Sequence, residues 1–194
     1  MDLAFNVAQL MKEPMGAHRS YDFAEPELLL SEPIAPDDAA LAARDIAGHA
    51  RLTRLNARLR VEGAVRAAVT LTCSRCLEEF TTVVQAPLDE IYLQTFDVSS
   101  GLPLPPEAGE DDADNFTIDH NHIVDLTEAV RQVLLVNLPF QPVCRAGCRG
   151  LCPQCGRNLN EGACDCRPQP ADPRLAALAN LLDDELTAER FSKN

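Results

Sequence analysis

The sequence of 194 residues contains no tryptophan and only two tyrosines, so aromatic surfaces for stacking nucleic-acid bases are scarce. No uninterrupted apolar run reaches the roughly 18–20 residues that a membrane helix needs. The first residues, from Met1 to Val7, lack the basic and apolar regions of a secretory signal peptide. Phosphate-cradling glycine loops and recognisable catalytic triads are also missing. We therefore expect a cytoplasmic protein that is neither membrane-bound nor an enzyme and has no small-molecule substrate.

Positive charge is in short supply as well. Lys and Arg number 17 against 30 Asp and Glu, a net charge of −13, which disfavours nucleic-acid binding by charge over the whole surface. The charges are also segregated, because seven arginines lie between Arg44 and Arg75 whereas residues 77–130 contain no Lys or Arg. The acidic stretch from Glu107 to Asp119 is interpreted as a solubilising linker, the alternative being a mimic of RNA phosphates that holds a basic partner.

Cysteine, in contrast, is plentiful. One Cys-x-x-Cys pair lies upstream and six further cysteines fall within a short segment: Cys73, Cys76, Cys144, Cys148, Cys152, Cys155, Cys164 and Cys166. A Cys-x-x-Cys turn delivers two of the four donors that Zn²⁺ binds tetrahedrally. Thiols stay reduced in the cytoplasm, and disulfides would require an export signal that the sequence lacks. We therefore predict one or two structural Zn²⁺ sites.

The spacing suggests how the cysteines pair. The last four lie close together in sequence, so closing that loop costs little entropy, and they are assigned to one Zn²⁺. By elimination the second site comprises Cys73, Cys76, Cys144 and Cys148. A conventional zinc ribbon, which would combine Cys73 and Cys76 with Cys152 and Cys155, stays open as an alternative. A thiol oxidoreductase using the first pair is a rival function, but the motif lacks the βαβ context of such enzymes.

Alternation of apolar and polar residues over 51–93 predicts an antiparallel meander with one apolar face. The predicted order is a strand over 54–61, a turn at Glu62-Gly63, a strand up to Cys73, a metal-binding knuckle and a third strand from Phe80. On the first of these strands, a period of two places three arginines on one face: Arg54, Arg58 and Arg60. They could grip RNA phosphates or an acidic protein surface, or pair with the chain's own carboxylates.

Further elements complete an α+β prediction. Residues 1–35 are expected to be extended, with a turn at Pro14–Gly16, and a helix is expected after Asp125, with Glu128 completing a capping box. The predicted fold is an antiparallel β-sheet meander with a zinc knuckle, one packed helix, a Cys-rich zinc module and a C-terminal helix. The expected divisions are a β-rich core over 1–143, the zinc-binding module over 144–170 and the C-terminal helix over 171–194.

Six segments in this order resemble landmarks of the YceD family, whose plant and bacterial members are named for large-subunit ribosomal RNA accumulation. They are Gln9–Gly16, Thr70–Cys76, Asp125–Glu128, Leu138–Pro142, Gly150–Asn160 and Asp172–Leu178. The resemblance implies a cytoplasmic, non-catalytic bacterial factor in synthesis, processing or stability of large-subunit (23S) ribosomal RNA. Its expected partner is a ribosomal RNA precursor, a ribosomal protein or an assembly factor. A zinc-dependent protein adaptor without RNA contact is the alternative, which the negative charge supports.

Overall fold

The computed structural model describes residues 3–31, 40–104 and 116–166. Contacts divide the chain into two compact units, Met1–Cys148 and Arg149–Asn194, and each is described by itself. The predicted boundaries of the zinc-binding module, after residues 143 and 170, stay a prediction. The predicted C-terminal helix lies outside the described residues, as does the acidic stretch up to residue 115.

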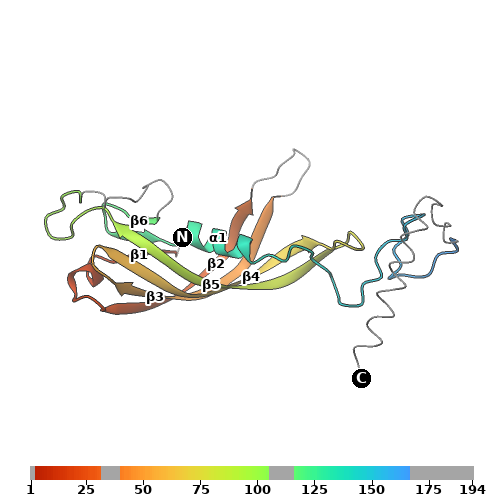
Figure 1. The fold of residues 1–194 in the computed structure, drawn as a ribbon, viewed down its shortest axis with the longest axis horizontal. Helices are drawn as coiled ribbons and strands as arrows, with labels where there is room; N and C mark the ends of the chain where they lie inside the picture. Colours follow the sequence, from red (N-terminus) through yellow and green to blue (C-terminus); the bar gives the residue numbers. More distant parts are fainter. Residues whose placement is uncertain (1–2, 32–39, 105–115, 167–194) are drawn as a thin grey trace, which may run out of the picture. The chain divides into compact units, whose positions relative to one another are not determined.

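The described part of the first unit is built on a five-stranded sheet in the order β2-β3-β4-β5-β6 (Figure 1). These strands are β2 (His18–Ser31), β3 (Leu41–Arg54), β4 (Arg58–Thr72), β5 (Glu79–Gln94) and β6 (Phe116–Ile118). The four long strands pair in sequence order and antiparallel, as a meander does, but the first two strand boundaries differ from the prediction. Short β6 pairs in parallel with β5.

Alternation along each strand separates an inner from an outer face, because successive side chains point to opposite sides of a sheet. On β4, Leu59, Val61 and Val65 are buried on the inner face, whereas Arg60 and Arg66 lie on the outer face. Burying such apolar faces supplies most of the stabilisation of a sheet of this kind, at about 25 cal/mol per Å².

The predicted turn at Glu62-Gly63 is wrong. β4 runs through both residues, with Gly63 paired to Ala50 on β3 and to Leu88 on β5. The chain instead reverses between β3 and β4, where the Leu55 N–H donates to the Arg58 carbonyl at 2.9 Å. Gly63 is needed inside the strand because a Cβ there would overlap the His49 carbonyl of β3.

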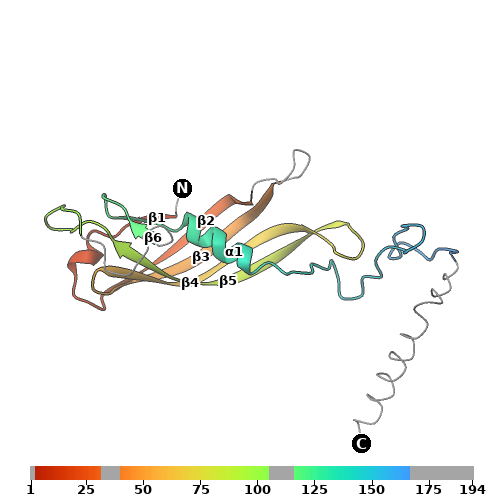
Figure 2. The ribbon, with the colours of Figure 1, turned by 45° about the horizontal axis from the view of Figure 1, so that its top comes forward.

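One helix, α1 (Thr127–Val136), covers the inner face of the sheet, as Figure 2 shows. Its Ala129, Val130 and Leu134 are buried in the core. The Arg131 guanidinium of α1 donates to the Leu30 carbonyl of β2 at 2.9 Å. Just before the helix, the Asp125 carbonyl accepts from the Tyr92 hydroxyl of β5 at 2.9 Å. Across residues 3–31, 40–104 and 116–166, the mostly β architecture with one α-helix agrees with the predicted α+β class.

Shorter elements close the same side of the core. β1 (Ala4–Asn6) pairs antiparallel with β7 (Ile123–Asp125), and the short 3₁₀ helix η1 (Leu10–Lys12) buries Leu10 and Met11. The chain turns at Pro14–Gly16 as predicted, with Gly16 at φ +84°. Among the described residues there is no helix with the length and apolarity needed to cross a membrane.

The start of α1 differs from the predicted capping box. The Asp125 carboxylate accepts the Thr127 N–H at 2.8 Å, so it does satisfy a backbone donor of the first turn. Glu128 does not reach back to the helix start, because its carboxylate accepts from Arg131 and Gln132 one turn further on. Glu128 therefore links side chains along the helix surface.

Candidate metal centres

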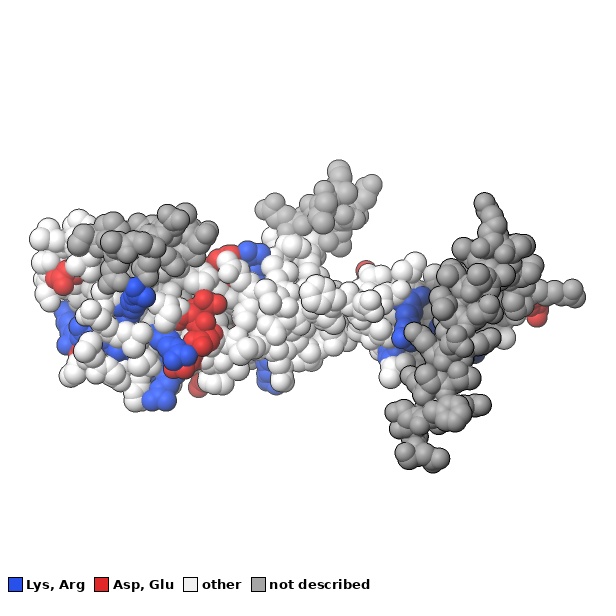
Figure 3. Space-filling view, in the orientation of Figure 1, with Lys and Arg blue, Asp and Glu red and all other residues white. Residues whose placement is uncertain are grey.

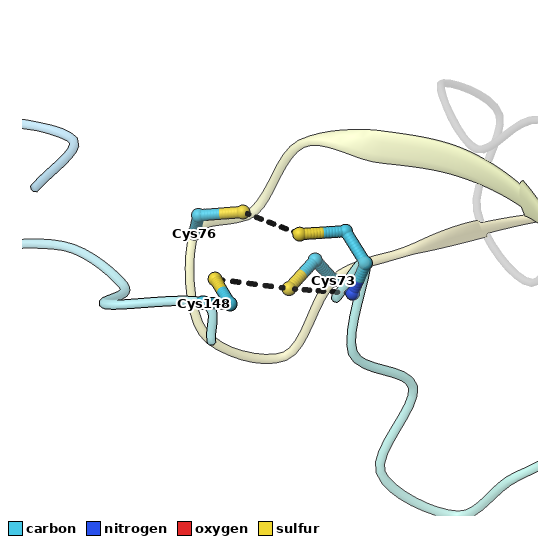
Figure 4. A group of neighbouring side chains, drawn as sticks. Cys73, Cys76 and Cys148 are labelled. Carbon is cyan, nitrogen blue, oxygen red and sulfur yellow. Dashed lines mark hydrogen bonds between the residues drawn. The ribbon is translucent and has the colours of Figure 1, made fainter. Parts of the chain in front are cut away.

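Four cysteines of the first unit converge where β4 meets β5. The sulfurs of Cys73, Cys76, Cys144 and Cys148 all lie within 4.8 Å of one another. The Cys73 and Cys148 sulfurs are 3.8 Å apart, and those of Cys76 and Cys144 are 3.7 Å apart. Figure 4 shows the labelled Cys73, Cys76 and Cys148 side chains directed toward a common point. We call this group centre 1.

Centre 1 is shaped by the tight connection between β4 and β5. The Cys73 N–H donates to the Glu78 carbonyl at 2.8 Å, and the Leu77 N–H donates to the Cys73 carbonyl at 3.0 Å. Leu77 adopts φ +60°, a left-handed conformation that few residues other than glycine favour. This reversal turns both the Cys73 and the Cys76 sulfur inward, and the Cys73 side chain is fully buried.

The segment after α1 supplies the other two sulfurs through contacts with this turn. The Ser74 N–H and hydroxyl both donate to the Pro142 carbonyl, at 2.8 and 3.0 Å. The Arg75 guanidinium donates to the Cys148 carbonyl at 3.1 Å. Segments about 70 residues apart in the chain are thereby held together, with Phe80 and Val143 packed beside the sulfurs.

The second unit carries the other four cysteines, which we call centre 2. The sulfurs of Cys152, Cys155, Cys164 and Cys166 also lie within 4.8 Å of one another. Cys152 is buried and Cys155 is exposed, so centre 2 is more open to solvent than centre 1.

A short turn positions the first two sulfurs of centre 2. The Cys152 N–H donates to the Arg157 carbonyl at 2.8 Å, and Gly156 takes φ +73°, where a glycine avoids strain. An isolated bridge between Leu151 and Asn158 closes the loop behind this turn.

Backbone donors favour one thiolate in each centre. The Cys144 N–H bonded to its sulfur is the largest cause that lowers the pKa of Cys73 to about 6. The N–H groups of Cys155 and Gln154 lower the pKa of Cys152 to about 6. Neighbouring thiols act in the opposite direction on Cys166, whose hydrogen bond with Cys155 is the main reason why its pKa rises to about 12. Several thiolates so close together need a cation to neutralise them.

The two centres contain the same sets of cysteines that the spacing predicts, and not the zinc-ribbon combination. All eight cysteines are free, and the 3.7–3.8 Å separations between paired sulfurs far exceed the ~2.05 Å of a disulfide bond. Cys73, in the turn after β4, is fully buried, which disfavours the thiol oxidoreductase alternative for this pair. Each centre could hold a metal ion.

The structure does not place the three predicted arginines on one face. Arg54 ends β3, and its side chain donates to the Glu13 carbonyl beside a polar hollow of about 200 Å³ that Lys12 and Asp97 also line. Arg58 and Arg60 lie on β4, on the outer face. The prediction fails because the turn between β3 and β4 separates Arg54 from the other two and reverses its side.

Arg60 is engaged by carboxylates of the same sheet. Its guanidinium donates two hydrogen bonds of 2.9 Å to Asp89 and lies 3.3 Å from Glu62. The hydrogen bond from Arg60 is the main cause that lowers the pKa of Asp89. Figure 3 shows acidic side chains directly beside basic ones on the visible surface of this unit. Arg60 thus follows the alternative interpretation, in which the arginines pair with the chain's own acids.

Sequence reasoning missed the asparagines that shape centre 2. The Asn160 side chain accepts the Arg149 N–H at 2.8 Å, and the Asn158 side chain accepts the Asn160 N–H at 3.0 Å. Their position directly after the Cys-x-x-Cys turn is the signal that could have identified them, since asparagine side chains commonly hold loops by bonding to the backbone.

In the part of the chain that the structure describes, the fold and the two centres define a class: a β-sheet protein with one packed α-helix and two four-cysteine groups. The sequence profile described as "Large ribosomal RNA subunit accumulation protein YceD" matches residues 61–182. The chain belongs to the YceD family.

Similar proteins occur in bacteria and plants. The chain is 30% identical over 192 residues to a Mycobacterium tuberculosis protein, "Uncharacterized protein Rv2926c", covering 97% of this chain and 86% of that one. It is 29% identical over 149 residues to the Arabidopsis thaliana "Large ribosomal RNA subunit accumulation protein YCED homolog 1, chloroplastic", covering 66% of this chain and 46% of the relative. A Zea mays protein of the same name is 30% identical over 139 residues, covering 61% of this chain and 47% of the relative. No solved structure matches the chain.

Proposed function

We propose that this protein is a non-catalytic, cytoplasmic factor that promotes the accumulation of large-subunit ribosomal RNA, with both cysteine centres loaded with structural zinc. The observation that carries the pathway is membership of the YceD family. The observation that carries the chemistry is the convergence of eight cysteines into two four-sulfur groups. In this proposal zinc holds the surfaces that meet a ribosomal RNA precursor, a ribosomal protein or an assembly factor.

The geometry of centre 1 fits zinc. A tetrahedral site with Zn–S bonds of about 2.3 Å has sulfurs about 3.8 Å apart. The two measured sulfur pairs of centre 1 are separated by 3.8 and 3.7 Å. Four thiolates complete the coordination of zinc and leave no position for water or substrate, which is the arrangement of structural sites. This supports a role in folding for the metal, and a non-enzymatic role for the protein.

Deleting the gene in the source organism tests the pathway. The ratio of mature large- to small-subunit ribosomal RNA should fall, and the wild-type gene should restore it. A variant with Cys144→Ser and Cys148→Ser should restore less, because centre 1 loses the two ligands that follow α1. A normal ratio in the deletion strain would contradict the proposed role.

A protein adaptor without RNA contact is the second candidate. The net charge of −13 and the engagement of Arg60 by Asp89 and Glu62 favour it. Capture of the tagged full-length protein, with and without nuclease, separates the two candidates. Partners retained after nuclease treatment, with no RNA recovered before it, would favour the adaptor.

A further inference from the structure

The outer face of the sheet contains a hollow of about 610 Å³ in the middle of the four long strands. Residues from β2, β3, β4 and β5 line it, among them Asp22, His49, Ala64, Arg66, Gln85 and Pro87. α1 packs on the opposite, inner face. Centre 1 lies at the turn between β4 and β5, so this hollow is separate from it.

Strand register shows how the hollow is built. Asp22 pairs with His49, His49 with Ala64 and Ala64 with Pro87, which makes one row across the sheet. In the next outer-face row Arg66 lies between Ala47 and Gln85. Neighbouring strands are about 4.8 Å apart, and outer-face residues on one strand recur about every 6.6 Å. The small side chain of Ala64 and the ring of Pro87 therefore lie between longer polar side chains.

The floor of the hollow is tightly packed from the other side. Gly48 on β3 lies under the Phe23 ring, and a Cβ at Gly48 would stand 2.7 Å from the Ala64 carbonyl oxygen. Gly63, the neighbour of Ala64, likewise has no room for a side chain beside β3. The strands pack closely at these two glycines, so the backbone that forms the floor is held in place. The hollow is therefore present without a bound ligand.

The charged side chains at the hollow differ from Arg60, on the same face of β4, in whether they have a partner. Arg66 is exposed and forms no hydrogen bond or ion pair with the described residues, in contrast to Arg60, which Asp89 and Glu62 engage. Asp22 is exposed and likewise has no partner in the described part of the chain. The rim thus offers a free guanidinium, a free carboxylate, the Gln85 amide and the His49 imidazole, around the uncharged surface of Ala64 and Pro87.

This combination matches the groups of a nucleotide. A phosphate pairs with a guanidinium through two parallel hydrogen bonds, which suits Arg66. Amino groups on a base edge donate to a carboxylate or an amide oxygen, which suits Asp22 and Gln85. The flat face of a base can lie on Ala64 and Pro87. The side chains of an acidic peptide would satisfy Arg66 but offer no amino donor to Asp22, so the hydrogen-bonding groups favour the nucleotide.

We propose that this hollow binds one unstacked nucleotide of single-stranded RNA. Its volume lies within the range of small-ligand pockets, about 300–1,000 Å³, and is too small for a duplex. Sequence-specific RNA recognition mostly targets unpaired loops, whose bases can be splayed out into such sites. The proposal rests on the proposed function, since it gives the family's link to ribosomal RNA a point of contact on this chain.

Fluorescence anisotropy with short single-stranded RNAs of mixed sequence, added to the zinc-loaded full-length protein at fixed salt, tests the site. Ala64→Phe fills the hollow and Arg66→Gln removes its free cation. Each should weaken binding by about tenfold or more, the loss typical of one good polar contact to a nucleotide. Thr70→Phe, an exposed position farther along the same face of β4, and Arg60→Gln, which removes the same charge outside the hollow, are the matched controls. Each control should change binding by less than about threefold.

Several results would overturn the site. These are an absence of RNA binding by the wild type, equal weakening by Arg66→Gln and Arg60→Gln, or normal binding by Ala64→Phe at an unchanged melting temperature. A protein partner that survives nuclease treatment and is lost only in Ala64→Phe, with RNA affinity unchanged, would assign the hollow to a protein instead. If Ala64→Phe fully restores ribosomal RNA in the deletion strain, the site fails while the proposed function stands.

Discussion

Removing the metal from centre 1 should destabilise the first unit far more than removing it from centre 2. The link between Cys76 and Cys144 closes a loop of 68 residues that contains β5, β6, β7 and α1. A cross-link over a loop of that length removes about 4 kcal/mol of chain entropy from the unfolded state. In centre 2, Cys155 and Cys164 are only nine residues apart, so the corresponding contribution is about 2.5 kcal/mol and is confined to the second unit.

The perturbation is Cys144→Ser with Cys148→Ser, and the matched control is Cys164→Ser with Cys166→Ser. Thermal unfolding followed by far-ultraviolet circular dichroism reports mainly on the sheet of the first unit. The first variant should melt about 10 °C below the wild type, whereas the control should melt within about 2 °C of it. A strong chelator should lower the wild type to the level of the first variant and change that variant little. Equal melting temperatures for the wild type and the first variant, with no effect of chelator, would show that no metal at centre 1 stabilises the first unit.

Three further predictions concern the fold. Gly63→Ala should lower the free energy of unfolding by about 3 kcal/mol, because the added Cβ would overlap the His49 carbonyl. The control Gly147→Ala should lower it by less than about 0.5 kcal/mol, because nothing lies within 4 Å of a Cβ there. Chemical denaturation measures both values, and equal stabilities of the two variants would contradict the prediction. The hydrogen bond from Arg131 lowers the pKa of Glu128 to about 2, below its ordinary 4.5, so the stability it contributes is present above pH 4.5 and is lost as the pH falls toward 2. Glu128→Gln should reduce the loss of unfolding free energy between pH 4.5 and pH 2 by less than about 1 kcal/mol, because the Glu128–Arg131 pair is partly exposed. An unchanged dependence of stability on pH would count against this ion pair. Tyr92→Phe should cost about 1 kcal/mol because the part-buried hydrogen bond to the Asp125 carbonyl is lost, and denaturation midpoints equal to the wild type would show that this bond contributes nothing.

Centre 2 can be predicted from the sequence because its four cysteines lie close together in the chain, so local spacing alone brings them together. Centre 1 is different. Cys73 and Cys144 meet only because the Pro142 carbonyl accepts from Ser74 and because α1 delivers the following segment to the β4–β5 turn. Spacing leaves the zinc-ribbon alternative open, and only the three-dimensional path of the chain separates the two pairings.

The arginine face shows where alternation misleads. Residues 54–61 alternate in hydrophobicity, yet the chain reverses at residues 55–57, so Arg54 lies on a different strand from Arg58 and Arg60. Gly63 resembles a turn residue but marks a close approach of strands. Most of β3 escapes prediction because a register shift between Arg44 and Ala47 interrupts its period of two. The outer-face hollow depends on cross-strand register, which no single segment of sequence specifies.

Native mass spectrometry of the freshly purified, untagged full-length protein tests the account most directly. It counts metal ions and disulfides on one intact chain. The account predicts two zinc ions per chain, one per four-cysteine centre, with one ion lost in the Cys144→Ser, Cys148→Ser variant and the other in the Cys164→Ser, Cys166→Ser variant. A folded chain that carries no metal, or whose mass shows the cysteines joined as disulfides, would contradict it.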